Sequence, residues 1–464
     1  MALKQFTTDF KSIGNQEFLR PNVGYRYFFD IKKSMVFKNP ITTQLKYILK
    51  PLLSNKIPKG ELDSREILVD LANIERRYNS LVNLEEVNQI GSDKNILNFG
   101  DIVIPKIQPQ MGNIFLNTDH TRYVASTELL EYTVCQDHNP VFVYYLITSK
   151  QFLADLERLE GGKTHRRVNP TDLLKIRIPT LSKRHQDQVV TEIEPIAIKI
   201  QALKTDIKPQ QEIIDKVFVR EFKFNKANFD QLSKIKMYET TFSEFANNID
   251  VRYSVKFHRN AGAFVLAELK KVTNKKIKHF IAEPIVLGTS VSPSDYDENG
   301  DYYYISMANI KNWKFENDDA KLVSNEYSKK NQNKTIALND ILIARSGEGT
   351  IGKVALIEDE ELLGIFADFT MRIKLKDYNP TFAYYYFRTT YFQYLIEINK
   401  KGLGNNTNIF PSQIQELPMM DIPLARQEKI VQEIKKELEE QNVIRSSIEQ
   451  ERAKIDEIIE KAIQ

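Results

Sequence analysis

The chain of 464 residues lacks most of the features that membrane proteins and disulfide-bonded proteins need. Its one cysteine, Cys135, excludes an internal disulfide and a thiolate metal site, and such sparing use of cysteine fits a reducing cytoplasm. No apolar run approaches the roughly 18 residues of a membrane span, and the N-terminus has no apolar signal segment. The sequence therefore predicts a cytoplasmic protein that does not cross a membrane.

Signals for catalysis are equally scarce. The sequence has no G-x-x-x-x-G-K-[ST] phosphate loop, and its six histidines are scattered without a metal-binding pair. Gly347, Gly349 and Gly352 form a G-x-G-x-x-G pattern after a predicted strand, with Asp368 beyond it. A dinucleotide site needs a helix directly after the glycines, whereas the segment that follows reads as strand and turn. We therefore predict a flexible loop and no cofactor here.

Two further patterns imitate functional motifs. The first resembles the start of a calcium loop but lacks its final glutamate, so we predict a hairpin turn. The second is an Asn-Pro pair, at residues 139–140 and 379–380, which resembles the motif that holds a flipped base in amino-methyltransferases. Both copies lack the second proline of that motif, so we predict helix-starting turns. The calcium-like residues are Asp295, Asp297, Asn299 and Gly300.

A long internal repeat is the most informative feature that is present. Gln186–Ile193 (QDQVVTEI) matches Gln427–Ile434 (QEKIVQEI), and the same offset of 241 residues (434 − 193) aligns QEIIDKVF with RAKIDEII. Upstream, FGDIVIPKI at Phe99–Ile107 parallels LNDILIARS at Leu338–Ser346. A period this long indicates two tandem domains and not a solenoid.

Each half reads as a mixed globular domain followed by a long helix. The segments IVIP and ILIARS are strand-like, whereas FVYYLITSKQFLADLERL and FAYYYFRTTYFQYLIEI have helical spacing. The predicted fold class is α/β (α+β). The predicted boundaries are a first domain at 1–182, a central spacer helix at 183–223, a second domain at 224–422 and a C-terminal spacer helix at 423–464.

Both spacers carry the apolar pattern of a coiled-coil seam, with steps of three and four residues. A helix of about 35 residues would span roughly 50 Å, and antiparallel pairing of the two would relate the halves by a pseudo-two-fold axis. Pro195 and Pro209 predict either a bend in the first helix or a helix that begins near Pro195. The seam positions are Ile193, Ile196, Ile200, Leu203, Ile207, Gln210, Ile214 and Val217, and Ile434, Glu437, Gln441, Ile444, Ile448, Glu451, Ile455 and Ile458.

These features together resemble one known family. Two variable domains, each closed by an "IP…Q…IV.EI" segment and a long amphipathic helix, are similar to the specificity subunit of type I restriction-modification systems. The segments that carry the resemblance are GDIVIPK, NDILIARSGEGTIGK, NPTFAYYYF, NNTNIFPSQIQELPMMDIPLARQEKIVQEI and its counterpart VNPTDLLKIRIPTLSKRHQDQVVTEI. The resemblance covers nearly the whole chain.

The resemblance implies a reader of DNA without chemistry of its own. Each target-recognition domain would read half of a bipartite double-stranded DNA sequence, and the helices would set the gap and recruit two methyltransferase subunits. Motor-nuclease subunits would join for cleavage. S-adenosylmethionine, ATP and Mg²⁺ would bind to those partners, with no cofactor in this chain. Two alternatives remain open: a fused, type II-like methyltransferase specificity protein, and a coiled-coil adaptor that binds no DNA.

Candidate DNA contacts lie in the matched loops and in basic clusters. Planar donor and acceptor groups are needed at base edges, and lysines suit phosphates, although a solvated surface is an equally good interpretation of any one cluster. In the first half the candidates are Lys106, Gln108, Gln110, Lys163, His165 and Arg166. In the second half they are Arg345, Ser346, Lys353, Lys400, Lys401, Asn405, Asn406, Thr407 and Asn408, with Lys271, Lys275 and Lys276 as phosphate contacts.

Overall fold

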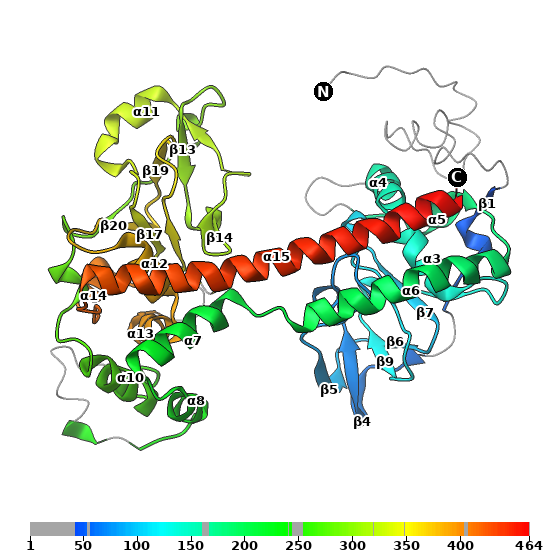
Figure 1. Ribbon diagram of the computed structural model, residues 1–464, viewed down its shortest axis with the longest axis horizontal. Coiled ribbons are helices and arrows are strands. Elements are labelled where there is room, and N and C mark those ends of the chain that lie inside the picture. Colours follow the sequence, from blue (N-terminus) through cyan, green and yellow to red (C-terminus); the bar gives the residue numbers. More distant parts are fainter. Residues whose placement is uncertain are drawn as a thin grey trace. The chain divides into compact units, whose positions relative to one another are not determined.

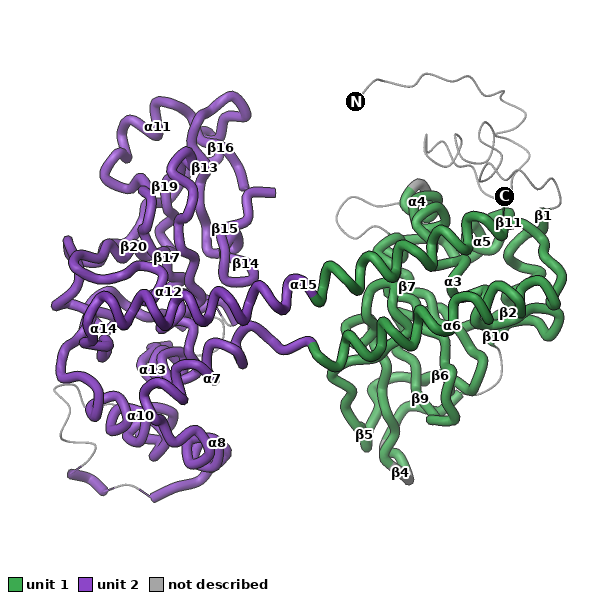
Figure 2. The backbone as a smooth tube through the Cα atoms, viewed as in Figure 1, with its two compact units in different colours: residues 1–206, 444–464 green, residues 207–443 purple. Residues whose placement is uncertain are grey.

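The computed structural model describes residues 42–52, 56–159, 167–239, 241–243, 254–318, 320–347, 349–402 and 407–463. The chain divides into two compact units (Figure 2). Unit 1 comprises residues 1–206 and 444–464, and unit 2 comprises residues 207–443. Both units combine β-sheets with helices, which confirms the predicted mixed α/β class. None of the helices in these described ranges is long and apolar enough to span a bilayer.

Unit 1 is built on a four-stranded and a five-stranded sheet. In the first, β10 pairs antiparallel with β7 at its centre, and all five residues of β7 are buried, as its unbroken apolar run predicts. In the second, β4 and β9 run parallel. The strand orders are β2 (Leu49–Pro51), β10 (Leu129–Val134), β7 (Asp101–Pro105), β8 (Phe115–Leu116), and β3 (Lys56–Ile57), β6 (Lys94–Leu97), β9 (Tyr123–Ala125), β4 (Gly60–Val69), β5 (Glu85–Ile90), with β1 (Thr42–Gln44) paired to β11 (Arg177–Pro179).

Four α-helices complete the described part of unit 1 before residue 206. Asn139 caps the first of them by accepting hydrogen bonds from the backbone of Val141 and Phe142, which confirms the predicted helix-starting turn. The helices are α3 (Pro140–Ile147), α4 (Lys150–Leu159), α5 (Pro170–Lys175) and α6 (Lys183–Thr205), and the 3₁₀ turns are η2 (Leu45–Tyr47), η3 (Leu71–Asn73) and η4 (Pro109–Met111).

Unit 2 repeats the core of this strand arrangement. Its four-stranded sheet has β20 and β17 at the centre, antiparallel like β10 and β7, and β13 runs parallel to β19 as β4 does to β9. The repeat in the sequence is therefore a repeat in topology. The strand orders are β12 (Val286–Leu287), β20 (Thr370–Ile373), β17 (Ile341–Ala344), β18 (Val354–Leu356), and β16 (Leu322–Val323), β13 (Tyr302–Ile305), β19 (Gly364–Phe366), with β14 (Ile310–Lys311) paired to β15 (Lys314–Phe315).

The helices of unit 2 surround an aromatic core in which Phe218, Phe382, Tyr386 and Phe392 are at most 1% exposed. Asn379 caps α12 by accepting from the backbone of Phe382, as Asn139 does for α3. The helices are α7 (Gln210–Phe222), α8 (Lys226–Lys234), α10 (Asn260–Lys270), α11 (Asn325–Lys330), α12 (Pro380–Arg388), α13 (Thr390–Asn399) and α14 (Pro411–Gln415), with 3₁₀ turns η5 (Ile277–His279), η6 (Pro293–Asp295), η7 (Met307–Asn309) and η8 (Gln332–Lys334).

The central spacer is two helices and not one. Helix α6 ends at Thr205 with Asp206 as its C-cap, and α7 begins at Gln210, directly after Pro209, whose extended backbone (ψ 137°) forms the N-cap of α7. Pro195 lies inside α6, so the alternative of a helix that begins near Pro195 is wrong. The helix is interrupted between Thr205 and Gln210.

The C-terminal spacer is one continuous helix, α15 (Leu424–Ile463), shown in red in Figure 1. Its residues up to Val443 belong to unit 2, and those from Ile444 onward belong to unit 1. Every predicted seam position on α6, α7 and α15 is buried or partly buried. Each unit is therefore completed by helical segments from both halves of the sequence.

Contacts within unit 2 establish the direction of the helices. Lys208 N donates to Gln441 Oε1 (2.7 Å), Lys216 pairs with Glu437 (3.1 Å) and Arg220 pairs with Glu433 (2.5 Å). One set of numbers rises as the other falls, so α7 and α15 run antiparallel. These cations are about half exposed, so each pair adds only ~0–1 kcal/mol and the apolar seam dominates the free energy of pairing.

A buried glutamine fastens each spacer helix to its own domain. In unit 2, Gln427 accepts from Asn379 N (2.9 Å) and donates to Ile422 O (2.8 Å). In unit 1, Gln186 makes the same two bonds, to Asn139 N and Leu181 O, both at 2.8 Å. The two glutamines are equivalent in the sequence repeat and are 2% and 1% exposed.

Replacing Gln427 with methionine should lower the free energy of unfolding by about 1–3 kcal/mol, because the backbone groups of Asn379 and Ile422 lose their partners. Chemical denaturation followed by circular dichroism would measure the loss. Gln432→Met on the exposed face of the same helix is the matched control and should be nearly neutral. Equal effects of the two substitutions would contradict the role of the buried amide.

Candidate nucleic-acid interface

The end of strand β17 brings together three segments that the sequence analysis selected. The Arg345 carbonyl accepts from Ile409 N (2.9 Å), and Ser346 forms a β-bridge with Asn408. Asn408 also exchanges two backbone hydrogen bonds with Lys401, each 2.7 Å long. Candidates separated by some sixty residues therefore lie side by side, but Ser346 and Thr407 are buried (7% and 4% exposed), and Asn405 and Asn406 lie outside the described residues.

Two phenylalanine rings flank the Arg345 guanidinium. Its Cζ atom lies 5.6 Å from the ring centroid of Phe369 and 5.7 Å from that of Phe410. The two phenylalanines are 43% and 40% exposed. Among the described residues, no hydrogen-bond acceptor or carboxylate pairs with the Arg345 side chain, and its Nε atom is buried without a partner. The sequence analysis missed both rings, since an aromatic residue beside a loop is usually assigned to the core.

The glycine loop after Arg345 is held in place. Thr350 Oγ1 donates to Ser346 O (2.7 Å), and Gly352 N donates to Ala344 O (2.8 Å). Gln393, on α13, donates to the carbonyl of Gly352 (2.8 Å). The described part of the loop is therefore tethered by hydrogen bonds, and its flexibility stays a prediction. Strand β18 follows the glycines, so the helix that a dinucleotide site needs is not formed there.

The calcium-like segment is a turn, but the prediction of a hairpin is wrong, because β13, which follows it, pairs with β16 and β19 and not with the preceding strand β12. Asp295 Oδ2 accepts from Ser292 N (2.9 Å), and Asp297 Oδ1 accepts from Asn299 N (2.9 Å). These carboxylates satisfy backbone amides at the entrance to β13. Within the described ranges, no three His, Cys, Asp or Glu residues are placed to hold a metal ion.

The equivalent position in unit 1 is Lys106, at the end of β7. Its backbone bonds repeat those of Arg345, because Lys106 N donates to Glu128 O (2.9 Å) and Val168 N donates to Lys106 O (3.1 Å). Its ammonium, however, donates to the carbonyl of Thr127. Gln108 is exposed with a left-handed backbone (φ 46°), and Gln110 is partly buried. Lys163, His165 and Arg166 lie outside the described residues.

The basic cluster at residues 270–278 is largely neutralised by carboxylates of unit 2. Two of its lysines share Glu416, and their hydrogen bonds hold the pKa of that carboxyl at about 2. The cluster is therefore less positive than its sequence suggests, and phosphate contacts by Lys271, Lys275 and Lys276 stay a prediction. The ion pairs are Lys271 with Glu268, Lys275 with Asp421 (3.2 Å), and Lys276 and Lys278 with Glu416 (2.6 Å each).

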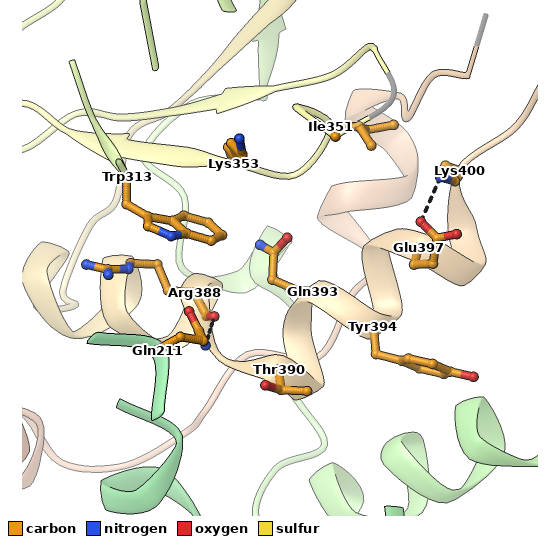
Figure 3. Close-up of a pocket in the computed structure, with 11 residues that line it drawn as sticks. Gln211, Trp313, Ile351, Lys353, Arg388, Thr390, Gln393, Tyr394, Glu397 and Lys400 are labelled. Atoms are coloured by element: carbon orange, nitrogen blue, oxygen red, sulfur yellow. Dashed lines mark hydrogen bonds and ion pairs between the residues drawn. The ribbon is translucent and has the colours of Figure 1, made fainter. Parts of the chain in front are cut away.

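A pocket of about 520 Å³ lies beside the glycine loop within unit 2. In Figure 3, Trp313 and Lys353 line one side and Gln393 and Tyr394 of α13 line the other. The ammonium group of Lys353, a predicted contact, makes no hydrogen bond or ion pair with any residue that the structure describes, whereas Lys400 is paired with Glu397 (2.7 Å). The pocket brings only these two candidates together.

Comparison with known proteins finds one family match, in the second half of the chain. Residues 270–451 match the family model of the type I restriction modification DNA specificity domain. Over these residues the chain is similar to a type I DNA specificity domain. The resemblance found in the sequence motifs is thus confirmed for this part of the chain, and the description of the matched domain is one of DNA specificity. No curated protein sequence matches the chain.

Several solved structures are similar to this chain at low identity. A structure from work on complex assembly and conformational transition of the type I R-M system is 14% identical, covering 92% of this chain and 99% of that one, with a TM-score of 0.42. The HsdS subunit from Thermoanaerobacter tengcongensis is 14% identical, covering 93% and 99%, with a TM-score of 0.32. The type I system S subunit from M. genitalium is 13% identical, covering 91% and 96%, with a TM-score of 0.37.

Replacing Gly352 with alanine should destabilise unit 2 more than replacing Gly349. Both glycines have positive φ (84° and 78°), so each alanine variant has a backbone cost of about 1–2 kcal/mol. At Gly352 the new Cβ would also lie 2.8 Å from Ile396 Cγ2, whereas Gly349 has no atom within 4 Å. Overpacking adds about 1–3 kcal/mol. Matching unfolding midpoints of the two variants would argue against a tightly packed loop.

Proposed function

We propose that this chain is the sequence-specificity subunit of a type I restriction-modification complex and acts in the cytoplasm. Recognition domains at 1–182 and 224–422 would each read one half of a bipartite double-stranded DNA target. The proposal is supported by the family match over residues 270–451 and by the same sheet topology in both units. A duplicated reader with altered loops suits two different half-sites.

The exchange of helical segments is the observation that carries the bipartite proposal. Helix α15 is continuous from Leu424 to Ile463, and it supplies residues to both units. A continuous helix is stiff and rises ~1.5 Å per residue. Such a connection suits a protein that must hold two readers at a defined gap, and the spacer segments 183–223 and 423–464 would set that gap.

Partner subunits would dock on the outer faces of the spacer helices. Ile198 on α6 is 64% exposed and Val443 on α15 is 58% exposed, so each helix keeps an apolar side chain at its surface. Two methyltransferase subunits would bind there, and motor-nuclease subunits would join them. S-adenosylmethionine, ATP and Mg²⁺ would be held by those partners.

The DNA would contact the loops at the ends of β17 and β7. In unit 2 this surface includes Arg345, Lys401 and Asn408, which the backbone bridges bring together, whereas the predicted contacts Ser346 and Thr407 are buried beneath it. In unit 1 it includes Lys106, Gln108 and Gln110. Side chains at the end of a rigid strand are held well enough to discriminate between bases.

Loss of this gene should abolish one bipartite adenine-methylation motif in cells that express the methyltransferase partner. Single-molecule sequencing of genomic DNA would reveal the motif and its gap. An unchanged methylation pattern would favour the coiled-coil adaptor. Methyl transfer by the purified chain alone with S-adenosylmethionine would instead favour the fused methyltransferase.

Adding one helical turn to each spacer should lengthen the gap by roughly one or two base pairs, since a turn is ~5.4 Å and base pairs are ~3.4 Å apart. The two half-sites should stay the same, because the insertions leave both sets of loops untouched. Exchange of the second domain for that of another specificity subunit is the complementary variant, and it should change one half-site only. An insertion that altered either half-site would argue against separate readers.

A further inference from the structure

We infer that Arg345 reads a guanine in the half-site of unit 2, and that Phe369 and Phe410 position its guanidinium. The inference rests on the proposed DNA-specificity function and adds to it a residue, a base and the means of orientation. The two rings lie 5.6 and 5.7 Å from Arg345 Cζ.

Arg345 differs from other arginines of unit 2 in having no polar partner among the described residues. Arg372 donates to Glu283 (2.5 Å), and Arg388 donates to Tyr384 (2.9 Å) and to Gln210 (3.0 Å). Those arginines are structural, since their terminal guanidinium nitrogens donate to groups inside the unit. Arg345 keeps its donors for a group outside the protein.

Aromatic rings are suitable flanks for an arginine that binds a base. They attract the guanidinium through the faces of their π-systems but accept none of the in-plane N–H groups, so the donor fork stays free. They also restrict rotation of the side chain, which lowers the entropy lost when it binds. Both phenylalanines are about two-fifths exposed, so they lie at the surface that a duplex would approach.

The backbone fixes these rings relative to the arginine. Arg345 N donates to the carbonyl of Phe369 itself (3.0 Å), and Ile409, which precedes Phe410, donates to the Arg345 carbonyl (2.9 Å). Arginine and rings therefore belong to three hydrogen-bonded segments and move together. A loop contact to phosphate needs no such orientation, because Lys and Arg bind phosphates from many directions.

The chemistry of the fork favours guanine over the other bases. In the major groove guanine presents two acceptors, O6 and N7, which match two parallel N–H donors. Adenine presents one acceptor beside a donor, and cytosine presents a donor, so neither satisfies the fork. Bidentate pairing to guanine is the arrangement that an oriented arginine serves best.

Unit 1 provides an internal comparison. The backbone bonds of Lys106 place Glu128 where unit 2 has Phe369, and Asn169 where unit 2 has Phe410. Its side chain is lysine, with its ammonium on the Thr127 carbonyl and no aromatic ring described beside it. The guanine reader is therefore a property of unit 2, and the two half-sites are read by different chemistry.

The test compares methylation motifs made by the complete complex with wild-type chain, Arg345→Ala, Arg345→Met and Lys106→Ala. The wild type should require a guanine at one position of the second half-site, and both Arg345 variants should accept any base there. The first half-site and the gap should not change. In both Arg345 variants, the preference for the guanine-containing duplex over a duplex altered at that position should fall roughly 10- to 100-fold from its wild-type value. Lys106→Ala should keep the guanine requirement.

Phe410→Leu and Phe369→Leu test positioning. Each should weaken discrimination at the same guanine by a smaller factor, with little change at other positions and a circular dichroism spectrum like that of the wild type. A structural role alone would instead lower the unfolding midpoint and leave discrimination intact. Arg345→Met keeps the aliphatic contact with the rings, so it separates loss of the fork from loss of packing.

The outcomes separate this inference from the proposed function. Absence of any bipartite motif with the wild-type chain overturns the proposed function itself. A wild-type motif that survives Arg345→Ala with every guanine intact, or a second half-site without guanine, overturns the inference alone. A uniform loss of affinity with a shallower salt dependence identifies Arg345 as a phosphate contact and also overturns it.

Discussion

The buried glutamine at the start of each spacer helix is the constraint from which the arrangement of each unit follows. Gln186 and Gln427 each bond both to the carbonyl two residues before their own helix and to the backbone amide of the Asn-Pro cap. A buried amide that satisfies both its donor and its acceptor fixes two helix starts against each other. The direction in which a spacer helix leaves its domain is therefore set at its first turn, before the apolar seam contributes.

The later part of each spacer bonds to its unit through a different side chain at one pair of equivalent positions. Gln211 of α7 donates to the carbonyl of Arg388, whereas its counterpart in the repeat, Arg452 of α15, donates to Thr148 O (3.1 Å) and is 1% exposed. An arginine at the Gln211 position would bury two guanidinium groups together, at a cost of several kcal/mol. The two copies of the repeat therefore differ at this position. If both had the same residue here, each helical segment could pack on either unit.

The sequence predicted what local pattern encodes and missed what depends on residues far apart. Apolar runs and Asn-Pro caps were sufficient for strands β7 and β17 and for the starts of α3 and α12, because each is encoded by a short local segment. Backbone pairing at the end of β17 even brought Arg345 to Asn408, as the matched loops suggested. By contrast, Lys276 pairs with Glu416 across 140 positions, so the cluster looked more basic than it is. The rings beside Arg345 were missed for the same reason.

The distribution of charge explains why so few side chains carry recognition. With a net charge of +3 over 464 residues and its main basic cluster paired internally, the chain has little unspecific attraction for a polyanion. A strongly basic DNA-binding protein would bind tightly to every sequence, and the many non-specific sites would then compete with the target. If the chain acts as proposed, the affinity for phosphate would be left largely to partner subunits, and the chain would contribute oriented groups such as Arg345, whose contribution depends on the base that they meet. Specificity and affinity would then be divided between subunits, and one pair of loops could be exchanged without rebuilding the complex.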